Sequence, residues 1–157
     1  MMSPPADGSN QMINWQENLI EHAEGIKTLL SQTRRIAVLG IKTEAQGSQP
    51  AFYVPQYLAS AGLEVIPVPV YYPNITHILG RQVFRKLIDV PGEIDLVNVF
   101  RRSEDIGAHL DDILAKRPQA VWFQSGLRND EVAAKLAQSG IKVVQDRCLM
   151  IEHRRLR

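Results

Sequence analysis

A glycine-containing loop is the first place in this sequence where the residue types could do chemistry. The apolar run 36–39 ends at Gly40, and Ser48 and Gln49 lie just before a helical pattern that starts near Ala51. A buried strand, a glycine loop and a helix start, in this order, direct backbone N–H groups and the positive end of a helix dipole toward an anion, usually a phosphate. The loop therefore predicts a nucleotide-type ligand, with glycines that merely make a turn as an equal alternative.

Two adjacent arginines predict a second contribution to anion binding. Arg101 and Arg102 directly follow the apolar run 96–100. The carboxyl ends of parallel strands meet at one edge of a sheet, and ligands of such sheets bind there. A guanidinium group can donate to two phosphate oxygens at once, so we expect an anion at this edge. The alternative is that one of the two arginines pairs with a structural carboxylate.

The fourth apolar run, 120–123, ends in polar and small residues. Gln124 supplies an amide, and Gly126 lets the backbone approach a ligand closely. For Trp122, inside the run, core packing is the expected role. Gln124 and Gly126 are therefore candidate binding residues.

Apolar periodicity indicates the elements that position these residues. Short runs rich in β-branched residues predict buried strands at 36–39, 65–70, 96–100, 120–123 and 143–144. Apolar residues at three- and four-residue spacing predict helices at 15–30, 52–61, 82–88, 104–116 and 130–139. The alternation predicts an α/β fold with right-handed crossovers and a parallel sheet of about five strands, with an added N-terminal helix.

Residues at the segment boundaries support this assignment. Ser103 and Asn129 are expected to cap helix N-termini with their side chains. Gly62 and Gly140 are expected to end helices in the left-handed conformation. The segment 148–153 fits either a short helix or an irregular return along the sheet edge.

The length of 157 residues corresponds to one domain, which we place at 13–157. Residues 1–12 combine Ser, Pro, Gly, Asp and Asn with little to bury, which predicts a disordered arm. Because no run reaches the roughly 18 consecutive apolar residues of a transmembrane helix, no membrane partner is expected.

Charge and cysteine content argue against further classes of partner and site. The formal net charge is +1, from acidic and basic residues scattered through the chain, so nucleic acid is not an expected partner. Cys148 is the single cysteine, which excludes an internal disulfide and leaves a zinc site without ligands. A single cysteine suits a reducing compartment, and we expect a cytoplasmic protein without a metal site.

The nicotinamide dinucleotide motif is not present in its usual form. Gly40 and Gly47 are seven residues apart, whereas the motif places its glycines at relative positions 0, 2 and 5. Tyr71 and Tyr72 follow the second strand, where that motif has an acidic residue for the ribose. The loop also has no P-loop lysine, because Lys42 is followed by Thr43 but not directly preceded by a glycine, as that motif requires.

Six segments, in their order along the chain, resemble one known family. They are 38–40, 67–69, 78–87, 95–102, 121–126 and 143–153. The most specific are Val-Phe-Arg at 99–101 and Asp-Arg-Cys at 146–148, with Trp-Phe-Gln-Ser-Gly between them. From about Arg34 to the C-terminus, the chain resembles coenzyme A-binding domain proteins, similar to the N-terminal domain of succinyl-CoA synthetase alpha subunits.

The resemblance implies a single Rossmann-like, doubly wound parallel sheet and coenzyme A, or an acyl-CoA, as the nucleotide ligand. It assigns the diphosphate loop to Gly40, Ile41, Lys42, Ser48 and Gln49, the adenosine to Pro67, Val68 and Pro69, and the third-strand edge to Val99, Phe100 and Arg101. Arg102, Gln124 and Gly126 complete the candidate site. The loop 41–49 is longer than usual in the family, and Val-Tyr-Tyr-Pro at 70–73 replaces its common Asn-Pro turn.

Catalytic groups are not recognisable as a set, so we expect a binding module rather than an enzyme. His22, His77, His109 and His153 form no arrangement with a nucleophile and are expected to be structural. The 146–148 cluster has two interpretations. Either the arginine favours a reactive Cys148 thiolate, or Asp146 pairs with Arg147 to hold the last strand while the cysteine packs, which we prefer.

Three functions stay open at this point. The leading hypothesis is non-catalytic binding of coenzyme A or an acyl-CoA. An NAD(P)-dependent oxidoreductase rests on the fold and the glycine loop alone. A regulatory or scaffold protein, whose Rossmann shell serves a partner, rests on the extra helix at 15–30. A homo-oligomer is compatible with each.

Overall fold

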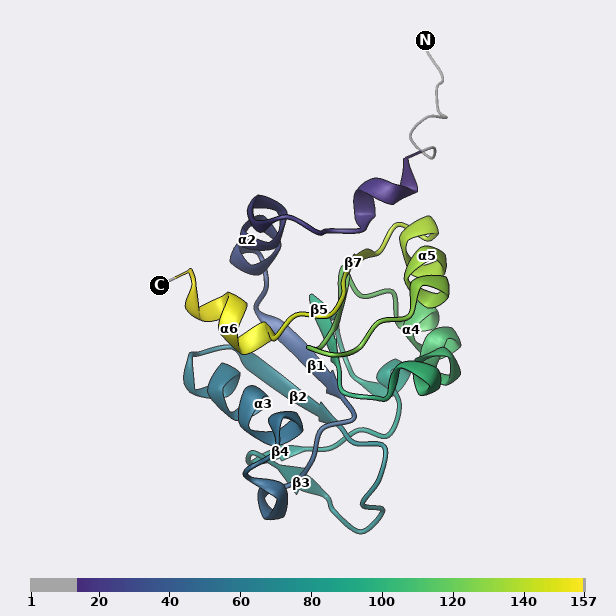
Figure 1. Cartoon of the computed structure of the whole chain (residues 1–157). Coiled ribbons are helices and arrows are strands. Elements are labelled where there is room, and N and C mark those ends of the chain that lie inside the picture. Colours follow the sequence, from purple (N-terminus) through teal and green to yellow (C-terminus); the bar gives the residue numbers. More distant parts are fainter. Residues whose placement is uncertain (1–13, 157) are drawn as a thin grey trace.

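Five parallel strands form the central sheet of the computed structural model, which describes residues 14–156 (Figure 1). The strands are β1 (Arg35–Leu39), β2 (Glu64–Val68), β5 (Leu96–Val99), β6 (Ala120–Phe123) and β7 (Lys142–Val144). Their order across the sheet is β2-β1-β5-β6-β7, and each neighbouring pair is parallel. The predicted parallel sheet is confirmed. The prediction for residues 1–12 lies outside the described residues.

Helices pack on both faces of the sheet, as Figure 1 shows. One face carries α2 (Ala23–Ser31), α3 (Pro50–Ser60) and α6 (Leu149–Arg154), whose buried residues belong to one core cluster. The other face carries α4 (Leu110–Lys116) and α5 (Asp130–Gln138), whose buried residues belong to a second cluster. The fold is therefore the expected Rossmann-like, doubly wound α/β arrangement.

Strand residues alternate between the two core clusters. In β1, Ile36 and Val38 pack toward α2, α3 and α6, whereas Ala37 and Leu39 pack toward α4 and α5. Successive side chains of a strand point to opposite faces, and here both faces are covered. This explains why the strands appear in the sequence as largely apolar runs.

The N-terminal helix predicted at 15–30 is confirmed only in its second half, and its first half is wrong. A 3-10 turn, η2 (Trp15–Asn18), is followed by extended backbone, and α2 begins only at Ala23, where the His22 side chain accepts from the Gly25 N–H. Between them the Ile20 N–H donates to the Val143 carbonyl at 2.8 Å. The backbone of this segment pairs with β7, and this tertiary hydrogen bonding overrides the helical periodicity.

The helix predicted at 82–88 is also wrong. The chain forms a hairpin of β3 (His77–Ile78) and β4 (Arg81–Gln82), followed by a 3-10 turn, η4 (Leu87–Asp89). Leu79 and Gly80, at the hairpin tip, have φ of 55° and 73°. Two central residues with positive φ are typical of the tight turn that suits the twist of a hairpin. The local turn therefore determines this segment.

The region predicted as one helix at 104–116 is divided. A 3-10 helix, η5 (Ser103–His109), precedes α4. Ser103 is not the N-cap, because η5 is preceded by Arg102 and the Ser103 hydroxyl instead accepts from the Arg128 N–H at 3.0 Å. Asn129 is an N-cap as predicted, since its side chain accepts from the Val132 N–H at 3.1 Å.

Other boundaries agree with the sequence. Gly62 and Gly140 follow α3 and α5 with φ of 98° and 88°, so both are left-handed helix ends as predicted. Of the two structures that the sequence allows for 148–153, a short helix or an irregular return, the helix is present as α6. The second strand stops at Val68, before the predicted end at 70.

The strand order reverses between β1 and β5. From β1 the chain crosses to β2 on one side, and it later enters β5 on the other side. In doubly wound sheets the loops on either side of such a reversal diverge and leave a crevice at the carboxyl ends of the strands. The fold therefore places the loops beginning at Gly40 and Phe100 next to a ligand crevice.

Candidate functional site

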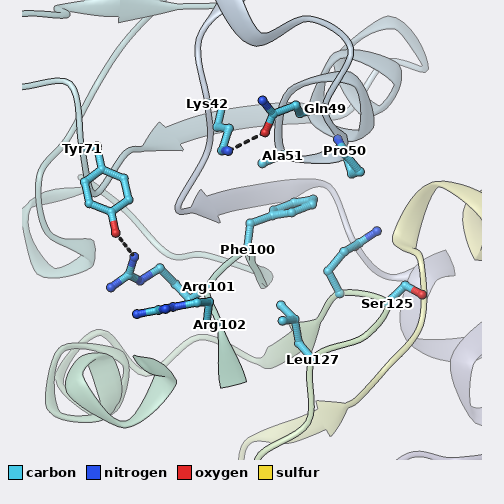
Figure 2. Close-up of a pocket in the computed structure, with 11 residues that line it drawn as sticks. Lys42, Gln49, Pro50, Ala51, Tyr71, Phe100, Arg101, Arg102, Ser125 and Leu127 are labelled. Atoms are coloured by element: carbon cyan, nitrogen blue, oxygen red, sulfur yellow. Dashed lines mark hydrogen bonds between the residues drawn. The ribbon is translucent and has the colours of Figure 1, made fainter. Parts of the chain in front are cut away.

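A pocket of about 380 Å³ opens at this reversal (Figure 2). Loops after four of the sheet strands line it. The lining residues are Lys42, Gln49, Pro50 and Ala51 after β1, Tyr71 after β2, Phe100, Arg101 and Arg102 after β5, and Gln124, Ser125 and Leu127 after β6. The structure thus brings together the three clusters of polar residues that the sequence singled out.

Gly40 allows the β1 loop to pass directly against the end of β5. Its φ is 88°, and an added Cβ would lie 2.1 Å from the carbonyl oxygen of Phe100. The Gly40 N–H donates to the Val68 carbonyl at 2.9 Å. Gly47, by contrast, has φ of −59° and needs no special freedom. Of the two glycines, only Gly40 is therefore needed, because no side chain fits between it and the end of β5.

The rest of the β1 loop is held by its own polar side chains. A 3-10 turn, η3 (Glu44–Gln46), has a capping box in which Thr43 accepts from the Ala45 N–H and Gln46 accepts from the Thr43 N–H. Lys42 Nζ donates to Gln49 Oε1 at 2.5 Å, as the dashed line in Figure 2 marks. The Lys42 ammonium group is thereby held at the pocket.

Helix α3 starts at the pocket without a side-chain cap among the described residues. Gln49 is the N-cap and Pro50 occupies the first turn, which contains no acidic residue. Pro50 has no N–H group, and the Phe52 N–H donates to the Gln49 carbonyl at 2.9 Å, so this helix start offers an anion the Ala51 N–H and the positive end of the helix dipole.

Arg101 is largely enclosed at the pocket, with 14% of its side chain exposed. Its Nε donates to His109 Nε2 at 3.1 Å, and its Nη1 donates to the Tyr71 hydroxyl at 3.1 Å (Figure 2). The guanidinium carbon lies 5.5 Å from the centre of the Tyr71 ring. Asp105 Oδ2 lies 4.0 Å from Arg101 Nη2. These contacts hold the guanidinium group in place at the pocket wall.

His109 accepts from Arg101 and is therefore neutral at Nε2. Burial lowers the pKa of His109, and the neighbouring Arg101 charge lowers it further, while Asp112 and Asp105 oppose the shift. Arg102 differs, because 75% of its side chain is exposed. It pairs with Asp105 at 2.9 Å, and this hydrogen bond raises the pKa of Arg102. One arginine is buried at the pocket and the other is solvent-facing.

Gln124 is buried, with 4% of the residue exposed, and still lines the pocket. Its Oε1 accepts from Asn98 Nδ2 at 3.2 Å and from the Leu149 N–H at 3.3 Å. Ser125 and Leu127 lie beside it on the loop after β6. The Gln124 amide is thus held by Asn98 on the neighbouring strand β5 and by the backbone at the start of α6.

The other residues predicted for the site lie outside the lining of this pocket. Ile41, Pro67, Val68 and Val99 are buried within the fold, Ser48 and Gly126 are exposed, and Gly40 lies against Phe100. Pro69 lines a second cavity of about 590 Å³, which is also bordered by Leu39 and His109. Because Arg101 and His109 are hydrogen-bonded, the two cavities are adjacent.

The preferred pairing of Asp146 with Arg147 is wrong. Asp146 accepts from the Gly126 N–H at 2.6 Å, while Arg147 donates to the Glu21 carbonyl at 3.0 Å and lies 3.6 Å from Glu152. These contacts still tie the end of β7 to its surroundings. Cys148 is half-buried and packs against the core cluster that contains α6.

Two observations concern other classes of site. Within residues 14–156, His, Cys, Asp and Glu side chains form no group that could hold a metal ion. In the same part of the chain, the helices are all too short or too polar to cross a membrane.

Tyr71 and Asn98 were not among the predicted site residues. In the sequence Tyr71 indicates only that an acidic residue and the family's Asn-Pro turn are missing after the second strand, yet it contacts Arg101. Asn98 stands as the polar member of the buried strand Leu96–Val99, which is a signal that sequence analysis could have used.

Comparison with known proteins gives consistent relatives. The uncharacterized protein YneT of Bacillus subtilis (strain 168) is 34% identical over 128 residues, which cover 82% of this chain and 91% of that protein. The solved structure of cell-free ID.343 from Thermus thermophilus is 40% identical with a TM-score of 0.79, covering 87% of this chain and 100% of that one. A hypothetical protein from Pyrococcus horikoshii OT3 is 29% identical with a TM-score of 0.76, covering 87% of this chain and 92% of that one.

The match to a protein family covers most of the chain. A family described as CoA binding domain matches residues 34–154, which include β1, all the loops that line the pocket, and α6 up to its last residue. With this match and the relatives above, the chain belongs to the CoA binding domain family.

Proposed function

We propose that the protein is a binding module for coenzyme A or an acyl-CoA, with no catalytic step of its own. The observation that carries the proposal is the pocket at the strand reversal, which Lys42 and Arg101 line together with the start of α3. A diphosphate is the chemical group that such a set of donors fits. The family match supports coenzyme A as the nucleotide that contains it.

In this proposal the diphosphate binds across the start of α3 and the arginines after β5. Gln49 and Lys42 are already in contact, so an incoming phosphate exchanges one acceptor of the ammonium group for another. Arg101 likewise exchanges the Tyr71 hydroxyl for a phosphate oxygen. Arg102 is exposed beside it and adds a second positive charge. Gly40, Ile41 and Ser48 shape the loop behind these groups.

The adenosine is assigned to the end of β2. Pro67, Val68 and Pro69 form this end, and Pro69 borders the cavity of about 590 Å³ next to Arg101 and His109. Val99 and Phe100 close the edge of β5, and Gln124 and Gly126 lie on the opposite side, after β6. The pantetheine arm would therefore leave the diphosphate in the direction of β6.

The proposal also includes the extent of the domain, the location of the protein and its partners. We propose one domain at 13–157 and a cytoplasmic location, the latter because a single cysteine suits a reducing compartment. The partner is a small-molecule nucleotide, with neither nucleic acid nor membrane. Self-association is compatible with this function and is measured independently, by light scattering with and without ligand.

The test is isothermal titration of the full chain with coenzyme A, with NAD and ADP as parallel ligands at moderate salt. Selective binding of coenzyme A supports the proposal and leads to acyl-CoAs as the next ligands. Equal binding of ADP would limit recognition to the nucleotide half. Binding of NAD alone would favour the oxidoreductase, and no binding at millimolar ligand would contradict the proposal.

A further inference from the structure

Asn98 is a polar side chain in the middle of an apolar core. It is 0% exposed, and its neighbours across the sheet are Val38 on β1 and Trp122 on β6. Its Oδ1 has no hydrogen-bond partner within residues 14–156. A buried amide oxygen without a donor destabilises a fold, so packing alone would favour an apolar residue of this size. Asn98 therefore needs a reason other than stability.

The hydrogen bonds around Asn98 fix the orientation of two amides. The backbone N–H of Leu149 is a donor only, so the atom of Gln124 at 3.3 Å from it must be the acceptor Oε1. The same Oε1 lies 3.2 Å from Asn98, which must therefore present its donor Nδ2 there. This arrangement leaves Asn98 Oδ1 unpaired. The cost falls on Asn98, and the gain is a second donor that holds the Gln124 amide in the orientation required by the Leu149 N–H.

The fixed orientation leaves one end of Gln124 for the pocket. With Oε1 held by two donors, Nε2 remains, and no hydrogen bond of Nε2 is formed within the described part of the chain. Gln124 is 4% exposed, and the pocket is where it reaches the surface. Phe100 and Leu127 line the same pocket, and neither can donate a hydrogen bond from its side chain. The Nε2 group is thus a neutral donor beside apolar groups.

We propose that Asn98 is a positioning residue, which holds Gln124 so that Nε2 donates to an amide carbonyl of the pantetheine arm. The inference rests on the proposed function and adds the contact that distinguishes coenzyme A from its nucleotide half. Pantetheine is an apolar chain interrupted by amides, so a neutral donor beside Phe100 and Leu127 suits it. The phosphates are assigned to the cationic groups nearer Tyr71.

The experiment compares two ligands on one set of variants. Coenzyme A and 3′-phospho-ADP, its nucleotide half, are titrated calorimetrically against the wild type and Asn98→Leu, and thermal unfolding of each protein is recorded. We expect the wild type to bind coenzyme A more tightly. In Asn98→Leu we expect this preference to fall about fivefold, the size of one neutral hydrogen bond, with the affinity for 3′-phospho-ADP unchanged and the Tm equal or higher.

Two further variants keep the outcome decisive. Gln124→Met removes the donor itself, so the preference must also fall, and it carries the test if Asn98→Leu does not fold. Val97→Ala is the control, since Val97 is equally buried on the same strand but packs on the opposite face. It should lower the Tm and leave the preference unchanged.

Each remaining result counts against one specific statement. An unchanged preference in Asn98→Leu or Gln124→Met, or a loss of Tm in Asn98→Leu with both affinities unchanged, overturns the positioning role. Equal wild-type affinities for the two ligands overturn the pantetheine contact while the proposed function stands. If the wild type binds neither ligand, the proposed function itself fails.

Discussion

The two walls of the pocket are built in different ways. On the wall after β5, Arg101 is held by groups that a ligand can replace, namely the Tyr71 hydroxyl and a neutral histidine ring. On the wall after β6, Gln124 is held from below by Asn98 and the start of α6, and its partners do not line the pocket. A ligand in the pocket can therefore compete for the partners of Arg101, whereas it leaves the partners of Gln124 in place.

The largest expected effect is on the junction that positions the charged wall. Gly40→Ala should lower the free energy of unfolding by about 3 kcal/mol or more, because the new Cβ would meet the Phe100 carbonyl at a positive φ. Urea denaturation measures this free energy of unfolding. The control is Gly62→Ala, with φ of 98° and no atom within 4 Å of the added Cβ, which should lose only about 1 kcal/mol. Similar losses in both variants would contradict the steric argument.

The next effect tests the charged wall itself. Arg101→Ala should weaken coenzyme A binding about tenfold or more, because a hydrogen bond to a charged group contributes roughly 1.5 to 3 kcal/mol. Titration calorimetry gives the ratio. Arg81→Ala is the control, since Arg81 is exposed and pairs with Glu64 on β2. Unchanged affinity in Arg101→Ala would remove Arg101 from the site.

The charged wall should also respond to pH through His109. A protonated His109 cannot accept from Arg101 and repels it, and its pKa in the folded protein lies below the usual 6.5. The unfolded chain then binds more protons, so the contribution to stability is complete above pH 6.5 and is lost as the pH falls through the folded pKa. Coenzyme A affinity should fall over the same range.

A matched variant isolates this dependence. His109→Gln keeps an acceptor for Arg101 and removes the titrating group, so the slopes of stability and affinity below pH 6.5 should both flatten. Measurements of Tm and Kd from pH 8 down to pH 5 show the change. Slopes that persist in the variant would assign the dependence to another group.

The smallest effect concerns the hydroxyl that competes with a ligand for Arg101. Tyr71→Phe removes the hydroxyl at 3.1 Å from the guanidinium group but keeps the ring beside it. A phosphate then no longer competes with this hydroxyl, so affinity for coenzyme A should rise about twofold, within the net value of a single hydrogen bond. A tenfold loss instead would indicate that the hydroxyl contacts the ligand directly.

The sequence predicted the features that are local and repeated. The five strands followed from buried apolar runs, and the start of α3 followed from the helical pattern after the glycine loop. The first half of the helix predicted at 15–30 and the helix predicted at 82–88 were wrong because a hydrogen bond to Val143 and a tight hairpin turn determine those segments. Such contacts join residues far apart in the chain, or depend on backbone conformation, and apolar spacing carries no signal for either.

The candidate site shows the same division. Gln49, Arg101, Arg102 and Gln124 were expected together because the carboxyl ends of parallel strands must meet, the family resemblance added Lys42 and Phe100, and these six residues line the pocket. Tyr71 and His109 could not be predicted as partners of Arg101, since nothing in their spacing indicates it. The contacts of Asp146 and Arg147 were wrong for a related reason, because adjacent charges in sequence need not face one another.

The extended segment that pairs with β7 has a consequence for association. Residues 19–20 cover the outer strand at that end of the sheet, while at the other end the Phe84 N–H donates to the Pro67 carbonyl of β2. Both edges are thus occupied by the chain's own backbone, which discourages edge-to-edge aggregation. A truncated chain that began at residue 23 would leave this edge of β7 unpaired and free to pair with a strand of another molecule. Any ordered self-assembly of the intact protein would then have to use its helical faces.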